Sequence, residues 1–416
     1  MNLNISIYNF IKKSYFTKLY SLFISSLVFF SYITLNFEYH RIISPWTELK
    51  RLTHSQLFNE VIISVFKPFL HIEKISGDLC GYECVYFANK ITWVLLTFLI
   101  SFLLIKRLRD YFINGSSRII KCLSFLIATS FPFLIRWASW GTIVDPLYAL
   151  GIFLLLMASN EFFILKNNNS FIKKPTAKRI AYAVIGVLII DLSRPYGFFA
   201  ICLFGILFIY KKSYKLIFSL LLGLLLAMPY HVVHYKKTGN LLLSNFTGCY
   251  LAQVTRPENY TSLPYEKKGF ESQLEILEIC NRAKKDIISE YYLSNPKLTI
   301  QKIFQLSRIK KIIFPSAFAP YKVTSNIFNP REFLDLVVTI ILYIFYCSVI
   351  IILLVNLKNS KMDIFTIFIL CTIILLPFFS SFIAHNGKES LRHTFHYYLP
   401  MLFLSLQFNQ LNIRKN

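Results

Sequence analysis

Residues 180–230 read IAYAVIGVLIIDLSRPYGFFAICLFGILFIYKKSYKLIFSLLLGLLLAMPY. Three apolar runs make up this stretch, interrupted first between Asp191 and Pro195 and then between Lys211 and Lys215. Apolar runs approaching 20 residues suit helices that cross hydrocarbon, and proline ends or kinks a helix because it lacks an N–H group. The stretch therefore predicts apolar helices over 180–193, 195–210 and 214–233, the first two being either separate or the halves of one re-entrant element.

The composition of the whole chain agrees with this local pattern. Of the 416 residues, 55% are hydrophobic and 16% are charged, and the mean hydropathy is +0.52. A soluble domain contains about a quarter charged residues, so this chain has too little polar surface to cover a water-facing globule. We predict an all-α polytopic membrane protein with about ten transmembrane helices, over residues 17–37, 89–105, 119–135, 143–165, 180–193, 195–210, 214–233, 333–356, 363–384 and 397–410.

The basic residues are distributed in a way that orients the chain. The net charge of +24 results from 45 Lys and Arg residues against 21 Asp and Glu residues. Short connections on the cytoplasmic side of a membrane are enriched in Lys and Arg. With both termini in the cytoplasm, the short outer turns carry only Arg136, Arg194, Lys388 and Arg392. Most of the charge therefore sets the topology and does not indicate a nucleic-acid partner.

Two long hydrophilic segments then lie on the outer side, within a single membrane domain over residues 1–416. The first, 38–90, contains an amphipathic stretch that suits the membrane surface, and the second is 234–331. Loops of this length inside a compact protein are usually functional. Four cysteines fall in these segments, and whether any of the three alternative pairings forms a disulfide is left open: Cys80, Cys84, Cys249 and Cys280.

An acidic residue, Glu38, stands just beyond the outer end of the first predicted helix. Partial burial at the rim of a helical bundle raises the pKa of a carboxyl group toward neutrality, which suits a general base. The alternative is an interfacial charge that pairs with Arg41, three residues later.

A second acid, Asp145, precedes Pro146 where the fourth helix is predicted to begin. Asp before Pro is a typical N-terminal helix cap. The functional alternative is an acid that faces the outer cavity and orients an acceptor or holds a cation. The two roles are compatible.

Three basic residues are candidate anion ligands. Arg194 follows the fifth predicted helix, and Lys388 and Arg392 stand four residues apart in the last outer turn. These side chains suit a phosphate group. The alternatives are an ion pair between Asp191 and Arg194, and snorkelling of Lys388 and Arg392 toward the membrane interface.

The histidine pairs His231/His234 and His393/His396 have no third metal ligand nearby, so interfacial anchoring is favoured over a metal site. The chain also lacks the phosphate-binding loop of nucleotide-driven transporters and the dinucleotide fingerprint.

Taken in chain order, these landmarks resemble the GT-C superfamily of membrane glycosyltransferases, which use polyprenyl-phosphate sugars as donors. The resemblance extends over nearly the whole chain and depends on the order of short motifs: Glu38, Phe66–Leu70 with Ser76–Gly77, Asp145–Leu147, Ser193–Gly197, Met228–Tyr230 with Thr238–Asn240, and Arg392 with Tyr398–Pro400. Within the superfamily, the chain length and the Glu after the first helix are similar to the serotype-converting O-antigen glucosyltransferases of bacteria and prophages.

This resemblance implies a protein of the bacterial inner membrane with its active site facing the periplasm. It implies glucose transfer from an undecaprenyl-phosphate donor to lipopolysaccharide O-antigen, with a companion flippase and donor synthase as partners. Glu38 would be the catalytic base, Asp145 would orient the acceptor or assist the base, and Arg194, Lys388 and Arg392 would bind the donor phosphate. The family's usual pattern of metal-binding acids is not evident in the first loop, so a divalent metal stays an open question and no metal ligand is assigned.

Two other readings remain. An O-antigen polymerase has similar length and span number, but its long loops usually lie later in the chain. A lipid-linked sugar flippase would predict short loops on both faces and internal pseudo-symmetry.

Overall fold

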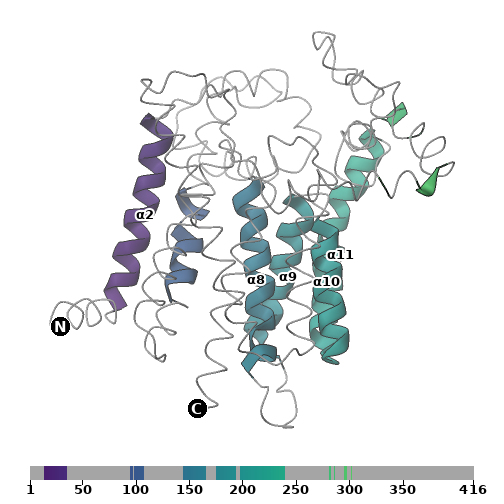
Figure 1. Cartoon of the computed structure of the whole chain (residues 1–416), viewed down its shortest axis with the longest axis horizontal. Helices are drawn as coiled ribbons and strands as arrows, with labels where there is room; N and C mark the ends of the chain where they lie inside the picture. Colours follow the sequence, from purple (N-terminus) through teal and green to yellow (C-terminus); the bar gives the residue numbers. More distant parts are fainter. Residues whose placement is uncertain are drawn as a thin grey trace.

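The described part of the chain consists of helices. A computed structural model describes residues 14–34, 94–96, 98–106, 144–164, 175–193 and 197–238, with isolated positions at 281, 282, 285, 295–297 and 301. The main helices are α2 (Ser14–Thr34), α8 (Val144–Ile164), α9 (Ala177–Ser193), α10 (Gly197–Tyr210) and α11 (Tyr214–Thr238) (Figure 1), and a shorter apolar helix covers Val94–Lys106. No strand occurs within these residues, so the all-α prediction is confirmed for them.

The predicted helices agree with the observed ones to within a few residues where the two can be compared. Helix α9 begins three residues before the predicted start at 180, and α11 continues to Thr238, past the predicted end at 233. The predicted spans 119–135, 333–356, 363–384 and 397–410 lie outside the described residues, as do the segments 38–90 and most of 234–331.

Helix α9 lies between α8 and α11 and packs against both (Figure 1). Glycines permit these close contacts, because a side chain at each would collide with backbone atoms of the neighbouring helix. A Cβ atom on Gly186 of α9 would lie 3.0 Å from the carbonyl oxygen of Gly151 in α8. One on Gly223 of α11 would lie 2.8 Å from the carbonyl oxygen of Val184 in α9. Both helix pairs therefore approach nearly to backbone contact.

Local hydrogen bonds define where α9 begins and how α10 turns into α11. The Thr176 hydroxyl and carbonyl oxygens accept bonds from the backbone N–H of Arg179, as expected for an N-cap. At the end of α10, the N–H groups of Lys212 and Ser213 donate to the carbonyl oxygens of Ile209 and Phe208. Lys212 has φ 51°, which completes a Schellman motif with lysine where glycine is usual.

Large apolar side chains remain exposed on the outer faces of α10 and α11. They include Ile206 and Ile209 on α10, and Phe218, Leu221 and Leu225 on α11. Over the described residues, one helix, Tyr214–Val232, is long and apolar enough to cross a membrane, while Val94–Lys106, Leu147–Ser159 and Gly197–Tyr210 are shorter apolar helices.

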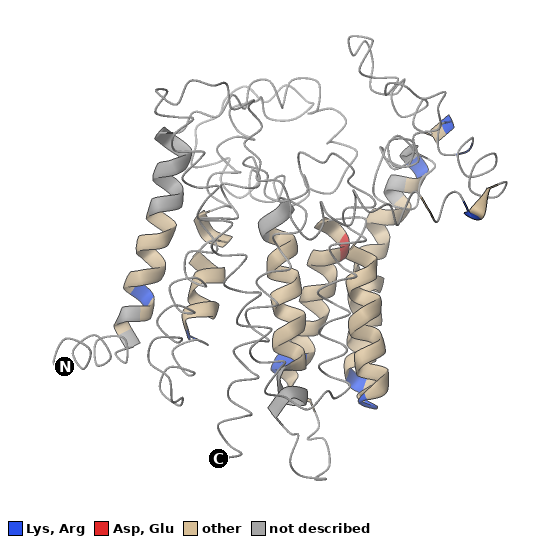
Figure 2. Cartoon of the chain, in the orientation of Figure 1, with Lys and Arg blue, Asp and Glu red and all other residues tan. Residues whose placement is uncertain are grey.

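The charged residues lie at the ends of the helices. Lys178 and Arg179 stand in the first turn of α9, and Lys211 and Lys212 form the α10–α11 turn. Figure 2 shows these basic positions at the lower end of the bundle and an acidic residue near the upper end of α9. That residue is Asp191, the one acid whose side chain the structure describes.

Candidate functional site

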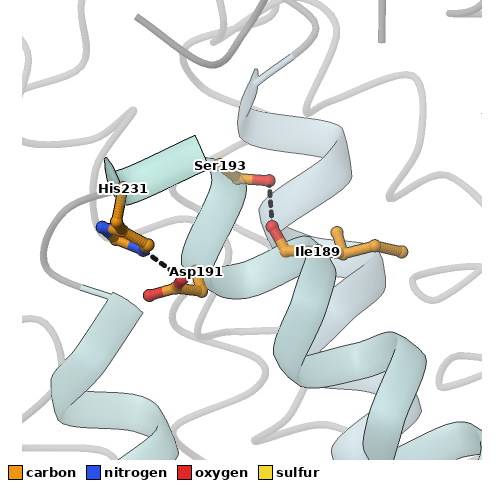
Figure 3. Close-up of polar contacts among 4 residues, drawn as sticks. All are labelled: Ile189, Asp191, Ser193 and His231. Carbon is orange, nitrogen blue, oxygen red and sulfur yellow. Dashed lines mark hydrogen bonds and ion pairs between the residues drawn. The ribbon is translucent and has the colours of Figure 1, made fainter. Parts of the chain in front are cut away.

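Asp191 contacts His231 across the interface between α9 and α11 (Figure 3). The His231 Nε2 atom lies 2.6 Å from the Asp191 Oδ2 atom. A carboxylate oxygen accepts, so Nε2 carries the proton and donates it in this contact. The His231 and Asp191 side chains are 16% and 11% exposed, so the pair is mostly shielded but reaches the surface of the bundle.

Apolar packing brings these two side chains together. Leu192, next to Asp191, packs with Ala227, which precedes His231 by one helical turn, and Leu188 covers this contact. The glycine contact of Gly223 with α9 lies one further turn below Ala227. Close approach of α9 and α11 along these turns therefore places the histidine within hydrogen-bond distance of the acid.

Helix α11 contains Pro229, two residues before His231. Because proline has no N–H group, the carbonyl oxygen of Leu225 loses its usual helical partner, and the helix bends readily at this point. In Figure 1 the upper part of α11 leans away from the rest of the bundle. The Asp191–His231 contact thus lies just beyond the proline.

Ser193 adds a polar group at the same end of α9 but directs it elsewhere. Its hydroxyl donates to the carbonyl oxygen of Ile189, four residues earlier in the same helix (Figure 3). Serines that bond back to the preceding turn contribute little to stability and can bend a helix slightly. Ser193 is therefore a suitable control position for changes to Asp191.

The opposite end of α9 carries a buried arginine. Arg179 is 6% exposed, and its Nε atom donates to the carbonyl oxygen of Ala158 in α8 at 2.7 Å. The adjacent Lys178 is exposed and lies over the Tyr182 ring, 5.6 Å from the centroid. Arg179 thus joins α9 to α8 at one end of the bundle, and Asp191 joins α9 to α11 at the other.

The residues predicted to form the site are mostly outside the described part. Glu38, Arg194, Lys388 and Arg392 lie there, so their placement and mutual distances stay predictions. Asp145 is the second residue of α8, and its backbone lies in the first turn of that helix. The helix start predicted near Asp145 is confirmed, and α8 begins at the same end of the bundle at which α9 ends (Figure 1).

The sequence did not predict the Asp191–His231 contact. It had associated Asp191 with Arg194 and His231 with His234, in each case three residues along the chain. One signal was available, since a charged residue inside an apolar run is costly unless it finds a polar partner. Helix α11 is the next helix that runs parallel to α9, and His231 stands near the end of α11 that lies beside the end of α9. His231 is the partner of Asp191 among the described residues, whereas Arg194 and the His234 side chain lie outside the described part of the chain.

Among the described residues, no three His, Cys, Asp or Glu side chains gather closely enough to hold a metal ion. The Asp191–His231 pair alone supplies two potential ligands, one fewer than a catalytic zinc site needs from protein. The divalent-metal question raised by the sequence depends on residues outside this part.

Comparisons of the chain with protein-family models, with curated proteins and with solved structures find no match.

Proposed function

We propose that this protein is a membrane-embedded glycosyltransferase that uses a polyprenyl-phosphate sugar as donor. The reaction is the transfer of glucose from undecaprenyl phosphate to lipopolysaccharide O-antigen at the periplasmic face of the bacterial inner membrane. The order of the sequence motifs supports this assignment, and the described helices support the kind of environment that it requires.

The observation that carries the proposal is the mostly buried Asp191–His231 pair at one end of an apolar bundle. Ionisable groups near hydrocarbon are costly, and when retained they usually mark a functional site. Asp191 lies just before Ser193-Arg194-Pro195 in the chain, one of the motifs that resemble the superfamily. Asp145, another motif residue, starts a helix at the same end.

The exposed faces of the helices favour a membrane as the surroundings. Ile206 of α10 and Leu225 of α11 are 61% and 67% exposed, and in water such a concentration of exposed apolar side chains would promote aggregation. Lys178, Arg179, Lys211 and Lys212 lie at the opposite end of the bundle from Asp191, although Lys236 lies at the outer end of α11 (Figure 2). The four residues at the lower end agree with the positive-inside pattern and an outward-facing site.

The proposed reaction is a single displacement at the anomeric carbon of the donor sugar. Glu38 takes the proton of an acceptor hydroxyl, and the oxygen attacks the anomeric carbon. The bond from that carbon to the phosphate oxygen breaks, and polyprenyl phosphate departs with the bonding electrons. Arg194, Lys388 and Arg392 neutralise its charge, which stabilises the transition state, and Asp145 orients the acceptor.

Replacement of the proposed base tests the assignment directly. In purified Glu38→Gln protein reconstituted into lipid vesicles, we expect donor binding to persist and sugar transfer to fall by about 100-fold or more. Glu48→Gln, in the same segment, is the matched control and should retain transfer. Turnover of Glu38→Gln close to that of the wild type would contradict the mechanism.

The phosphate role of Arg194 has a separate test. Arg194→Ala should raise the KM for the undecaprenyl-phosphate donor while leaving the KM for the acceptor nearly unchanged, since it removes a charge-assisted contact to phosphate. An unchanged donor KM would instead favour a structural role for Arg194.

The product distinguishes this function from its alternatives. Mass spectrometry of lipopolysaccharide from cells with and without the gene should show one added hexose per modified repeat. A changed chain length would favour an O-antigen polymerase, and loss of a modification without any transfer activity in vitro would favour a flippase.

A further inference from the structure

We infer that the Asp191–His231 contact is a latch that holds the outer end of α11, residues 229–238, against α9. The two side chains are positioning residues, and the contact determines the direction in which α11 leaves the bundle. This latch is a property of the described helices. Its effect on sugar transfer, given below, rests on the proposed function.

The exposure of α11 shows where the helix leaves its neighbours. Ala227 is completely buried, whereas Met228, Tyr230, Val232 and Tyr235 are 52%, 39%, 44% and 52% exposed. His231, at 16%, is the least exposed described side chain beyond Ala227. Its contact with Asp191 is therefore the point at which the outer end of α11 still meets the bundle through a described side chain.

Because of Pro229, the outer end of α11 needs such a contact to keep one orientation. The missing hydrogen bond to the Leu225 carbonyl oxygen lowers the resistance of α11 to bending at this turn. Apolar packing holds the helix below the proline, through Ala227 against Leu192, but the described apolar side chains above it are exposed. A hydrogen bond between an imidazole and a carboxylate is stronger than one between neutral groups and has a defined direction. It therefore selects one orientation of a segment that would otherwise have several.

The sequence predicts that the residues after Thr238 belong to the second long outer segment, 234–331. Because long loops in compact proteins are usually functional, we expect this segment, under the proposed function, to take part in acceptor selection. When residues 229–238 of α11 are held in one direction, less conformational entropy of the protein is lost as the acceptor binds. The contact should therefore matter for acceptor binding more than for donor binding.

The latch itself is tested by distance measurements that do not depend on activity. The full-length protein would carry spin labels at Cys202, which is exposed on α10, and at Tyr235→Cys on the outer end of α11, with the other cysteines replaced by alanine. We expect one narrow distance distribution. Asp191→Ala and His231→Ala should each broaden or shift it, and the double variant should resemble either single variant because both remove the same contact.

Two variants make the measurement specific. His231→Gln retains an N–H donor and should restore part of the narrow distribution, whereas Ser193→Ala, which changes a hydroxyl bonded within α9, should leave it unchanged. Narrow, unshifted distributions in both alanine variants would overturn the latch. If the alanine variants do not fold, the exchange Asp191→His with His231→Asp provides the test, since it re-forms the pair and should keep the distance, and a broadened distance in that exchange would count against the latch.

Transfer kinetics then test the consequence for function. Asp191→Ala and His231→Ala should raise the KM for the acceptor on the order of tenfold, in keeping with the cost of misplaced substrate-binding elements, while the KM for the donor stays within about twofold of the wild type. An unchanged acceptor KM beside a broadened distance would overturn the link to the acceptor. Absence of transfer by the wild-type protein would overturn the proposed function and leave the distance result standing.

Discussion

Helices α9 and α10 follow one another in the chain and are both apolar, but they occupy opposite kinds of position. Helix α9 contains Lys178, Arg179 and Asp191, and it lies between α8 and α11. Helix α10 contains no charged residue, yet Phe198, Ile206 and Ile209 are each more than half exposed. The helix with charges is central, and the helix without them exposes an apolar face.

This arrangement of charged and uncharged helices is the reverse of the one expected for a protein in water. In a soluble protein the helix without charges would be buried, and the one with charges would expose them. In a lipid bilayer the solvent is itself apolar, so charged side chains gain by facing other helices and finding partners there. The difference between α9 and α10 agrees with the lipid surroundings that we propose, and the following substitutions test that proposal.

The largest effect should come from placing an acid on the exposed face of α10. If this face contacts lipid, Ile206→Asp should destabilise the inserted protein by about 2.5–3.5 kcal/mol. Ile206→Ala, the control, removes apolar area without adding charge and should have a much smaller effect. The measurement is the amount of folded protein in the membrane and its unfolding temperature in detergent. If α10 instead faces water, Ile206→Asp will be tolerated to within about 0.5 kcal/mol.

The next effect should come from the contact between α9 and α11. Gly223→Ala puts a methyl group where backbone and Val187 side-chain atoms lie closer than 3.0 Å, so the helices must separate, at a cost of about 1–3 kcal/mol. Gly205→Ala in α10 is the matched control, because its methyl group would meet only the Cδ1 atom of Leu220 at 3.8 Å. Thermal unfolding should separate the two variants, and equal unfolding temperatures would show that α9 is packed no more tightly than α10.

Arg179, at the end of α9 that we propose is cytoplasmic, is the next position. Its replacement should lower stability as much as Gly223→Ala does, or less. Arg179→Met removes the hydrogen bond to the Ala158 carbonyl oxygen and should lower stability by about 1–3 kcal/mol. The neighbouring Lys178→Met removes only an exposed charge beside Tyr182, worth no more than about 1 kcal/mol. Unfolding in denaturant measures both, and a reversed order would mean that burial of Arg179 does not decide its contribution.

The smallest effect should come from Ser193→Ala. Its hydroxyl bonds back to Ile189 within α9, and loss of such a bond should change stability by less than about 0.5 kcal/mol. Unfolding temperature measured in parallel with Asp191→Ala checks this value. A loss as large as that of Asp191→Ala would indicate that the end of α9 depends on its backbone bonds more than on the contact with α11.

The positions of the helices could be predicted from the sequence because they depend on local features. Apolar runs, the Pro195 break and the Lys211–Lys212 turn delimit α9, α10 and α11 to within a few residues. The extension of α11 beyond 233 was missed, since residues 234–238 are polar and aromatic and carry no apolar periodicity. Pro229 did not end the helix, because a single missing hydrogen bond is tolerated after a turn of strong helix formers, residues 224–228.

The Asp191–His231 contact could not be derived in the same way. Spacing along the chain favoured Arg194 as the partner of Asp191 and His234 as the partner of His231. In both pairs the residues stand three apart, which suits neighbours on one helix face. Which partner a polar side chain takes depends on how closely α9 and α11 approach and on their rotation about their axes. The glycine contact at Gly223 and the packing of Leu192 on Ala227 determine both.

By itself, the sequence determined, for the residues that the structure describes, that the chain is helical and apolar and where its helices begin and end. It also indicated which residues are chemically suited to a site. Those properties follow from hydropathy, proline and capping, which act over one or two turns. The tertiary structure decided that α9 is central, that α10 exposes an apolar face, and that Asp191 meets a histidine forty residues away. Such contacts depend on the shapes of facing helix surfaces, which no local pattern encodes.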